Sequence, residues 1–182
     1  MIKATKELLR YLEKENSKTE MSMISAFSNA IITYGGQEDG EAVAKYLLDH
    51  QEDYSLYYLY EVVKKCGNKE IAKEFFRKGV DSGELKAGFD LEILEVLGKF
   101  QLEEARPMLI EYALGESGYY MNLHAVMGLL NYNCDDLQDR IRSSIETIYN
   151  KNLFNEYLPS MVCKLKDRAE VLEKLYSTGT EY

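Results

Sequence analysis

Apolar residues return along this chain at the spacing of paired helices. Near the end of a predicted helix stand two adjacent apolar residues, then comes a short polar turn, and then a second amphipathic helix. The four doublets are Ile31 with Ile32, Val62 with Val63, Val96 with Leu97, and Val126 with Met127. Their second members are 31, 34 and 30 positions apart, a repeat length typical of stacked helix pairs. We therefore expect an all-α superhelix, an α-solenoid of about five helix pairs.

The predicted helices fill the chain from end to end. Residues 4–15 predict an opening helix within an N-terminal cap of residues 1–18, and residues 153–178 predict two C-terminal capping helices. No alternating pattern typical of a strand interrupts them, and no stretch rich in Gly, Ser and Pro suggests a linker. The sequence therefore predicts a single repeat domain over residues 1–182.

For two of the predicted helices, the sequence indicates which residues are buried. The helix from Ser22 to Tyr34 is expected to bury an apolar stripe and to end at two glycines that adopt the left-handed conformation. That stripe consists of Met23, Ile24, Phe27 and Ile31. The helix from Tyr54 to Cys66 is expected to bury a second stripe. Its members are Leu56, Leu59, Tyr60, Val62, Val63 and Cys66.

One stretch resembles a known repeat family. Residues 90–131 are similar to HEAT-like repeats, including the variety named after phycobilisome lyases, in which an Ala-Leu-Gly helix end precedes an Ala-x-Pro-x-Leu helix start. The matching residues are Val96, Leu97 and Gly98, then Ala105, Pro107 and Leu109, then Val126, Met127 and Gly128. The resemblance implies that the expected superhelix is a HEAT-like solenoid with a binding role. Departures from it are Lys64 in place of a glycine, Lys73 in place of a proline, and Asp90 and Tyr120 in place of the family's ladder arginine.

The net charge of −9 narrows the class of partner. Residues 101–140 are the most acidic stretch, with two basic residues against seven acidic ones. Because nucleic acids and anionic membranes attract clustered Lys and Arg, this balance disfavours both as ligands. It favours a basic protein partner or serves solubility alone. The charged N-terminus, with no window as apolar as a membrane span, predicts a cytoplasmic location.

Histidines and cysteines give little reason to expect catalysis. His50 and His124 lack metal-ligand spacing, and Cys66, Cys134 and Cys163 lack CxxC spacing, so we expect no metal, no cofactor and three buried reduced thiols. The deoxyhypusine hydroxylases, which share the HEAT-like architecture, need adjacent His and Glu pairs that are missing here. HEAT-like DNA glycosylases use a basic face with Trp, whereas this chain is acidic and has no Trp.

The tyrosines give a positive indication of a binding surface. Tyr54, Tyr57 and Tyr58 share a helix whose other face carries the apolar stripe, so some phenol groups should face outward. We predict a partner-binding surface suited to Lys and Arg, because tyrosine rings and carboxylates both attract cations. Its members are Tyr54, Tyr57, Tyr58, Glu61, Asp90, Glu95, Tyr120 and His124. The alternative is that the tyrosines only fill gaps between repeats and that His124 is simply packed.

These patterns favour a non-enzymatic protein-binding solenoid. One role that fits is an immunity or inhibitor protein that captures a basic partner such as a toxin. An adaptor or scaffold, and a bilin-lyase-like enzyme of the same architecture, stay open as alternatives. The sequence leaves the oligomeric state open as well.

Overall fold

The computed structural model describes residues 1–14, 21–50, 57–82, 91–150, 161–163, 165, 169 and 173. Within these segments every regular element is a helix and no strand occurs, which confirms the all-α prediction. The chain forms two compact units, Met1–Leu102 and Glu103–Tyr182. No helix of the described residues is both long and apolar enough to cross a membrane.

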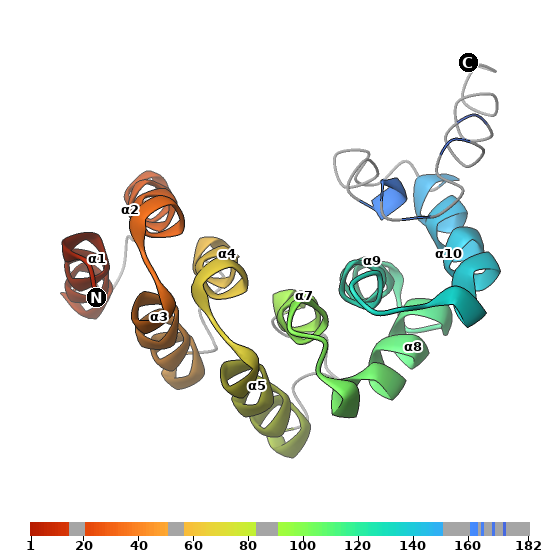
Figure 1. Cartoon of the computed structure of the whole chain (residues 1–182), viewed down its shortest axis with the longest axis horizontal. Helices are drawn as coiled ribbons and strands as arrows, with labels where there is room; N and C mark the ends of the chain where they lie inside the picture. Colours follow the sequence, from red (N-terminus) through yellow and green to blue (C-terminus); the bar gives the residue numbers. More distant parts are fainter. Residues whose placement is uncertain are drawn as a thin grey trace. The chain divides into compact units, whose positions relative to one another are not determined.

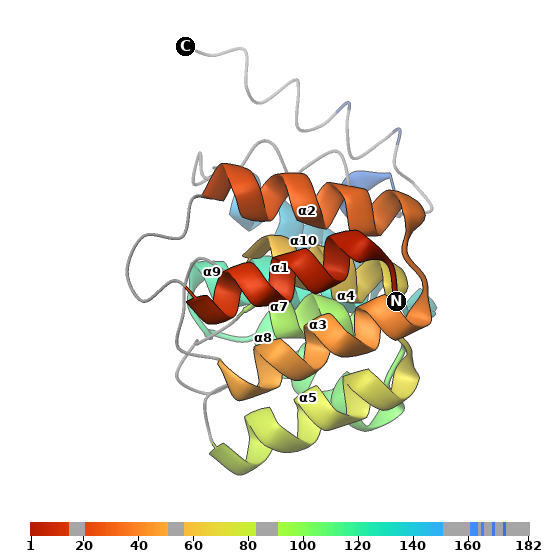
Figure 2. The same ribbon diagram turned by 90° about the vertical axis from the view of Figure 1, so that its left-hand side faces the viewer.

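The first unit is built from helices that pack in two rows. Its elements are α1 (Lys3–Lys14), α2 (Met21–Tyr34), α3 (Gln37–Asp49), α4 (Tyr57–Cys66), α5 (Lys69–Ser82) and α7 (Glu92–Lys99). One row contains α2, α4 and α7, and the other contains α3 and α5 (Figure 1). The first helix, α1, lies against both α2 and α3, as the turned view shows (Figure 2).

The apolar stripes form the core of this unit, with one correction. The predicted α4 stripe is confirmed, since Leu59, Tyr60, Val62, Val63 and Cys66 are all buried, while Leu56 lies outside the described residues. On α2 the prediction was partly wrong. Ile24, Ser28 and Ile31 are buried, but Met23 is 39% exposed and Phe27 is half-buried. Because α2 is apolar on more than one face, its periodicity alone did not identify the face that packs.

The turn between α2 and α3 also differs from the expectation. Neither Gly35 nor Gly36 has a positive φ, and Gly36 is extended at the N-terminal cap of α3. Gly35 is needed for a close approach instead. A Cβ atom there would lie 2.6 Å from the carbonyl oxygen of Ile31, closer than real Cβ contacts. The chain therefore uses the small size of this glycine and not its left-handed conformation.

Asp39 anchors α1 to the start of α3. Its Oδ1 accepts hydrogen bonds from the backbone N–H of Ile2 at 2.8 Å and from the Thr5 hydroxyl at 2.5 Å, and its Oδ2 accepts one from the Gly36 N–H at 3.0 Å. Burial would raise the pKa of Asp39, but these hydrogen bonds outweigh it and hold the pKa below its ordinary value. The buried carboxylate is therefore charged at neutral pH.

Gly40 brings α3 into backbone contact with the turn between α4 and α5. A Cβ atom at Gly40 would lie 2.4 Å from the carbonyl carbon of Cys66 and 2.6 Å from the amide nitrogen of Gly67. No side chain fits in that space. Glycine at this position therefore sets the distance between α3 and the turn that joins α4 to α5.

In the described part of the second unit, two helices pack against a third helix that lies between them in the sequence. Its elements are the short 3-10 helix η2 (Glu103–Ala105), α8 (Arg106–Leu114), α9 (Tyr119–Leu129), the 3-10 helix η3 (Asp135–Leu137) and α10 (Gln138–Asn150). Asn122 of α9 donates hydrogen bonds to the carbonyl oxygens of Tyr112 at 2.6 Å and Gly115 at 3.0 Å, which caps the C-terminus of α8. Ser144 of α10 donates another to Ala113 at 2.8 Å.

The four predicted doublets lie in α2, α4, α7 and α9, one in each helix. The predicted C-terminal capping helices, residues 153–178, lie outside the described residues apart from the few positions named above.

Candidate functional site

Two tyrosines open α4 and present a partly exposed aromatic surface. Tyr57 and Tyr58 are half-buried, and the residues that follow them, Leu59 and Tyr60, enter the core. The rings of Tyr57 and Tyr58 meet edge to face, with centroids 5.4 Å apart and planes inclined by 69°. Edge-to-face pairing is favourable for aromatic rings, so each ring holds the other in place. Two tyrosines of the predicted binding surface therefore lie in contact at the start of α4.

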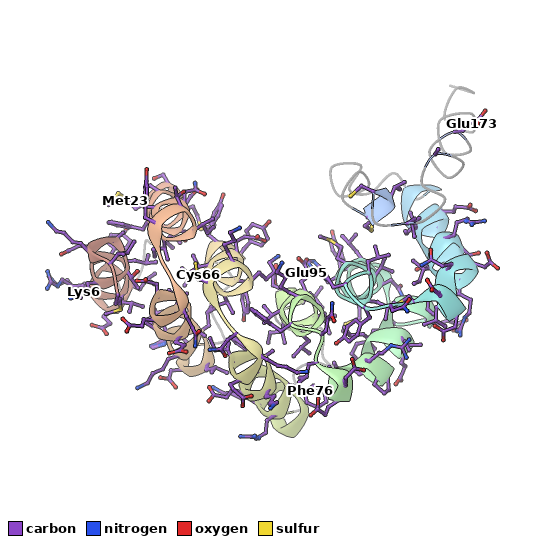
Figure 3. The ribbon with its side chains drawn as sticks, in the orientation of Figure 1. Lys6, Met23, Cys66, Phe76, Glu95 and Glu173 are labelled. Carbon is purple, nitrogen blue, oxygen red and sulfur yellow. The ribbon has the colours of Figure 1, made fainter. Side chains whose placement is uncertain are left out.

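About two turns further along α4, Lys64 pairs with two of the predicted site carboxylates. Its Nζ lies 2.6 Å from Oε1 of Glu61 on the same helix and 2.5 Å from Oε2 of Glu95 on α7. The side chains of Lys64 and Glu95 are only 15% and 8% exposed, whereas that of Glu61 is 37% exposed. Figure 3 labels Glu95, which extends from α7. We call these three residues the Lys64 triad.

The two carboxylates of the Lys64 triad favour the protonated form of Lys64. Burial would lower the pKa of Lys64, but the carboxylates of Glu95 and Glu61 outweigh it and raise this pKa above its ordinary value. The lysine therefore stays protonated at neutral pH. Two carboxylates and one ammonium leave a net charge of −1, and the most exposed carboxylate is that of Glu61.

Glu61, Tyr57 and Tyr58 together form what we call the α4 patch. All three lie on the part of α4 that is not in the core, and Glu61 is one helical turn beyond Tyr57 and Tyr58. A partner's Lys or Arg could contact a phenol ring and the Glu61 carboxylate at the same time. Because Lys64 fixes the position of Glu61, part of the entropic cost of ordering that side chain is met before a partner arrives.

Lys64 was missed by the sequence reasoning, although a signal for it was present. The residue was noted as a departure from the glycine of the repeat family, but its position three residues after Glu61 on one helix face was not used. Its contact with Glu95 depends on the packing of α4 against α7, which no local pattern reveals.

The other predicted site residues divide between two places. Tyr54 and Asp90 lie outside the described residues. Tyr120 and His124 belong to α9 in the second unit, where Tyr120 is 53% exposed and His124 only 8% exposed. The burial of His124 agrees with the alternative that it is a packed residue, since little of it can reach a partner. Tyr120 stays accessible to one.

The three cysteine thiols differ in their exposure to solvent. Cys66 and Cys134 are buried, but Cys163 is exposed, so the expectation of three buried thiols was wrong for Cys163. Burial raises the pKa of both Cys66 and Cys134, and this suppresses the thiolate form that reacts with electrophiles. Within the described part of the chain, no group of three or more His, Cys, Asp or Glu side chains is arranged to hold a metal ion.

Comparisons of this chain with models of protein families, with curated proteins and with solved structures gave no match.

Proposed function

We propose that this chain is a non-enzymatic, protein-binding α-solenoid of the HEAT-like type, a single repeat domain that captures a basic protein partner. The observation that carries the proposal is the α4 patch, where two tyrosines stand beside a carboxylate fixed by an internal lysine. Tyrosine gives a large contact area with little side-chain entropy to lose, and it is enriched at the energetically important positions of protein interfaces.

The charge of the molecule supports a cationic partner. The chain carries a net charge of −9, and the Lys64 triad keeps a net charge of −1 beside the two rings. Long-range attraction of a basic protein would speed association, and the contacts at the patch would then slow dissociation. The narrower role that we propose is the neutralisation of a basic toxin, in the manner of an immunity protein, with an adaptor or scaffold as the competing role.

Affinity capture with matched variants tests the proposal. The wild-type chain, a Tyr57→Ala/Glu61→Gln variant and a Tyr46→Ala/Glu74→Gln control would each be used to retain partners from the lysate of a cell that produces the protein. The control removes one tyrosine and one carboxylate from α3 and α5. We expect a basic protein bound by the wild type and the control but lost from the α4 variant, with association that slows as salt is added.

The same experiment contains the results that would overturn the proposal. A captured protein with a low isoelectric point, binding that is insensitive to salt, or equal capture by the α4 variant would each contradict it. The partner's own activity then separates the two roles, because an immunity protein abolishes that activity and an adaptor leaves it intact.

A further inference from the structure

The carboxylate of Glu61 is bound by Lys64 through one oxygen only. Nζ of Lys64 lies 2.6 Å from Oε1 of Glu61 and 2.5 Å from Oε2 of Glu95. Within the described part of the chain, Oε2 of Glu61 takes part in no ion pair or hydrogen bond. The side chain of Glu61 is 37% exposed, so a partner can reach this oxygen. One acceptor of the α4 patch is therefore left for a donor from outside the chain.

The neighbours of Glu61 along α4 favour one direction of approach to that oxygen. Lys64 and Lys65 follow Glu61 by three and four positions and lie on the turn beyond it. Tyr57 and Tyr58 precede it by four and three positions and lie on the turn before it. Because the two lysines repel a further cation, the favourable approach to Glu61 passes over the tyrosine rings.

The two tyrosine rings provide a surface on which a flat cation can stack. They meet edge to face, so the ring that supplies its edge keeps its own faces out of their mutual contact. Both side chains are half-buried, which limits their motion and excludes part of the surrounding water. A cation binds over an aromatic face through the ring quadrupole, and the attraction is stronger where water is excluded.

Arginine suits this arrangement better than lysine does. A guanidinium group is planar, so it can stack on a ring while the N–H groups at its edge donate to a carboxylate. It is also more weakly hydrated than an ammonium group, so it loses less hydration energy on entering a half-buried site. An ammonium group concentrates its charge at one point, and on Glu61 that point would lie close to the ammonium of Lys64. A guanidinium group spreads the same charge over the ring.

We propose that the α4 patch binds an arginine side chain of the partner protein. The guanidinium group of that arginine stacks on one of the two tyrosine rings and donates a hydrogen bond to Oε2 of Glu61. This inference rests on the proposed function and narrows it, because it names the residue by which the patch recognises a basic partner. A basic protein that presents only lysines to the patch binds less tightly.

Peptides of equal charge test the proposal. A displayed library in which each basic position is either Arg or Lys would be selected against the full-length wild-type chain. We expect the enriched peptides to share an arginine at one position. In a synthetic peptide from that set, replacing this arginine by lysine should raise the dissociation constant about tenfold or more. Citrulline, which is planar but uncharged, should weaken binding at least as much. Isothermal titration calorimetry measures both changes.

Variants of the α4 patch show whether its residues cause the preference for arginine. Glu61→Gln should bind the Arg and Lys peptides equally weakly. Tyr57→Phe/Tyr58→Phe keeps both rings and should keep the preference, whereas Tyr57→Leu/Tyr58→Leu should lose it. The matched control is Glu74→Gln at an exposed position of α5, which should change nothing. Circular dichroism would confirm that the double-leucine variant folds, and Glu61→Gln carries the test if it does not.

Four results would overturn the inference. They are failure to enrich any peptide, equal binding of the Arg and Lys peptides by the wild type, and an unchanged preference for arginine in either Glu61→Gln or the double-leucine variant.

Failure of this inference and failure of the proposed function give different results. Suppose that the lysate partner is lost from the Tyr57→Ala/Glu61→Gln variant while Lys peptides bind as tightly as Arg peptides. The patch then binds a basic protein without selecting arginine, and only the inference fails. If Arg peptides need Glu61 but capture from the lysate does not depend on the patch, the arginine site stands and the proposed function fails.

Discussion

Lys64 of α4 and Glu95 of α7 form an ion pair of 2.5 Å although they lie 31 positions apart in the sequence. Both side chains are largely buried, and Glu61 supplies a second carboxylate to the same ammonium group. The arrangement fixes α7 against α4 at the site where the α4 patch begins. Separate substitutions can measure how much this ion pair and the other contacts contribute to stability.

Removal of Lys64 should destabilise the first unit. The Lys64→Met variant leaves the buried Glu95 without its cation, and breaking a buried pair in this way costs about 3 kcal/mol. Urea unfolding measures the loss. The exposed Lys73–Glu70 pair of α5 provides the control, since Lys73→Met should change the free energy of unfolding by less than about 1 kcal/mol. A double Lys64→Met/Glu95→Leu variant should recover most of the stability, and failure to do so would mean that the charge is not the cause.

Acid should weaken the anchor formed by Asp39. The pKa of this carboxyl is held below its ordinary value of 3.8 in the folded chain, so its hydrogen bonds contribute their full stability above that pH. The contribution is lost as the pH falls below 3.8 and through the lower folded pKa. Asp39→Asn should cost about 2 kcal/mol at neutral pH. It should also flatten the acid limb of a plot of unfolding free energy against pH, and an unchanged acid limb would contradict this prediction.

Gly40→Ala should be more harmful than its size suggests. The added methyl group meets the backbone of Cys66 and Gly67, which cannot move aside as a flexible side chain can. We expect a loss of about 2 kcal/mol or more in the free energy of unfolding. Gly36→Ala is the control, because no atom lies within 4 Å of a Cβ there, and its cost should be about 1 kcal/mol or less. Equal effects of the two substitutions would refute the contact.

Removal of the Asn122 side-chain amide should loosen the end of α8. Its two hydrogen bonds satisfy the carbonyl oxygens of Tyr112 and Gly115, so Asn122→Ala should cost about 1–2 kcal/mol. Hydrogen exchange would show the loss as faster exchange confined to the last turn of α8. Faster exchange throughout the second unit would instead indicate global destabilisation.

The three thiols should react at different rates with a chromogenic disulfide reagent. Cys163 is exposed and should react in the native chain, whereas Cys66 and Cys134 are buried and should react only after unfolding. A Cys163→Ser variant should abolish the fast phase. Rapid labelling of Cys66 would show that the packing of α4 against α2 opens readily.

Local pattern was enough to predict the helices and not enough to predict the site. Helix ends were predicted within a few residues, because apolar periodicity and turn glycines act over short distances. The packing face of α2 was assigned wrongly for Met23, since several of its faces are apolar. Glu61 and Glu95 were selected as partner-binding carboxylates, but the pairing of Glu95 with Lys64 depends on the contact between α4 and α7.

The exposure of α2 is a second feature that the local sequence pattern could not predict. The sequence reveals that Met21–Tyr34 has no charge, yet both a buried helix and a binding helix can have that composition. Only the packing of the chain distinguishes α2 from α9. Neither α2 nor α9 contains Asp, Glu, Lys or Arg, and only burial shows that α2 has the more exposed surface.

The three hydrogen bonds that meet at Asp39 join the first turn of α1 to the first turn of α3. Because α1 stands at the end of the chain and these contacts are few, we expect it to be able to detach while α2 and α3 stay folded. Such a helix is a natural early unfolding segment, whose release would expose Leu8 and Leu12 together with the α2 surface that covers them.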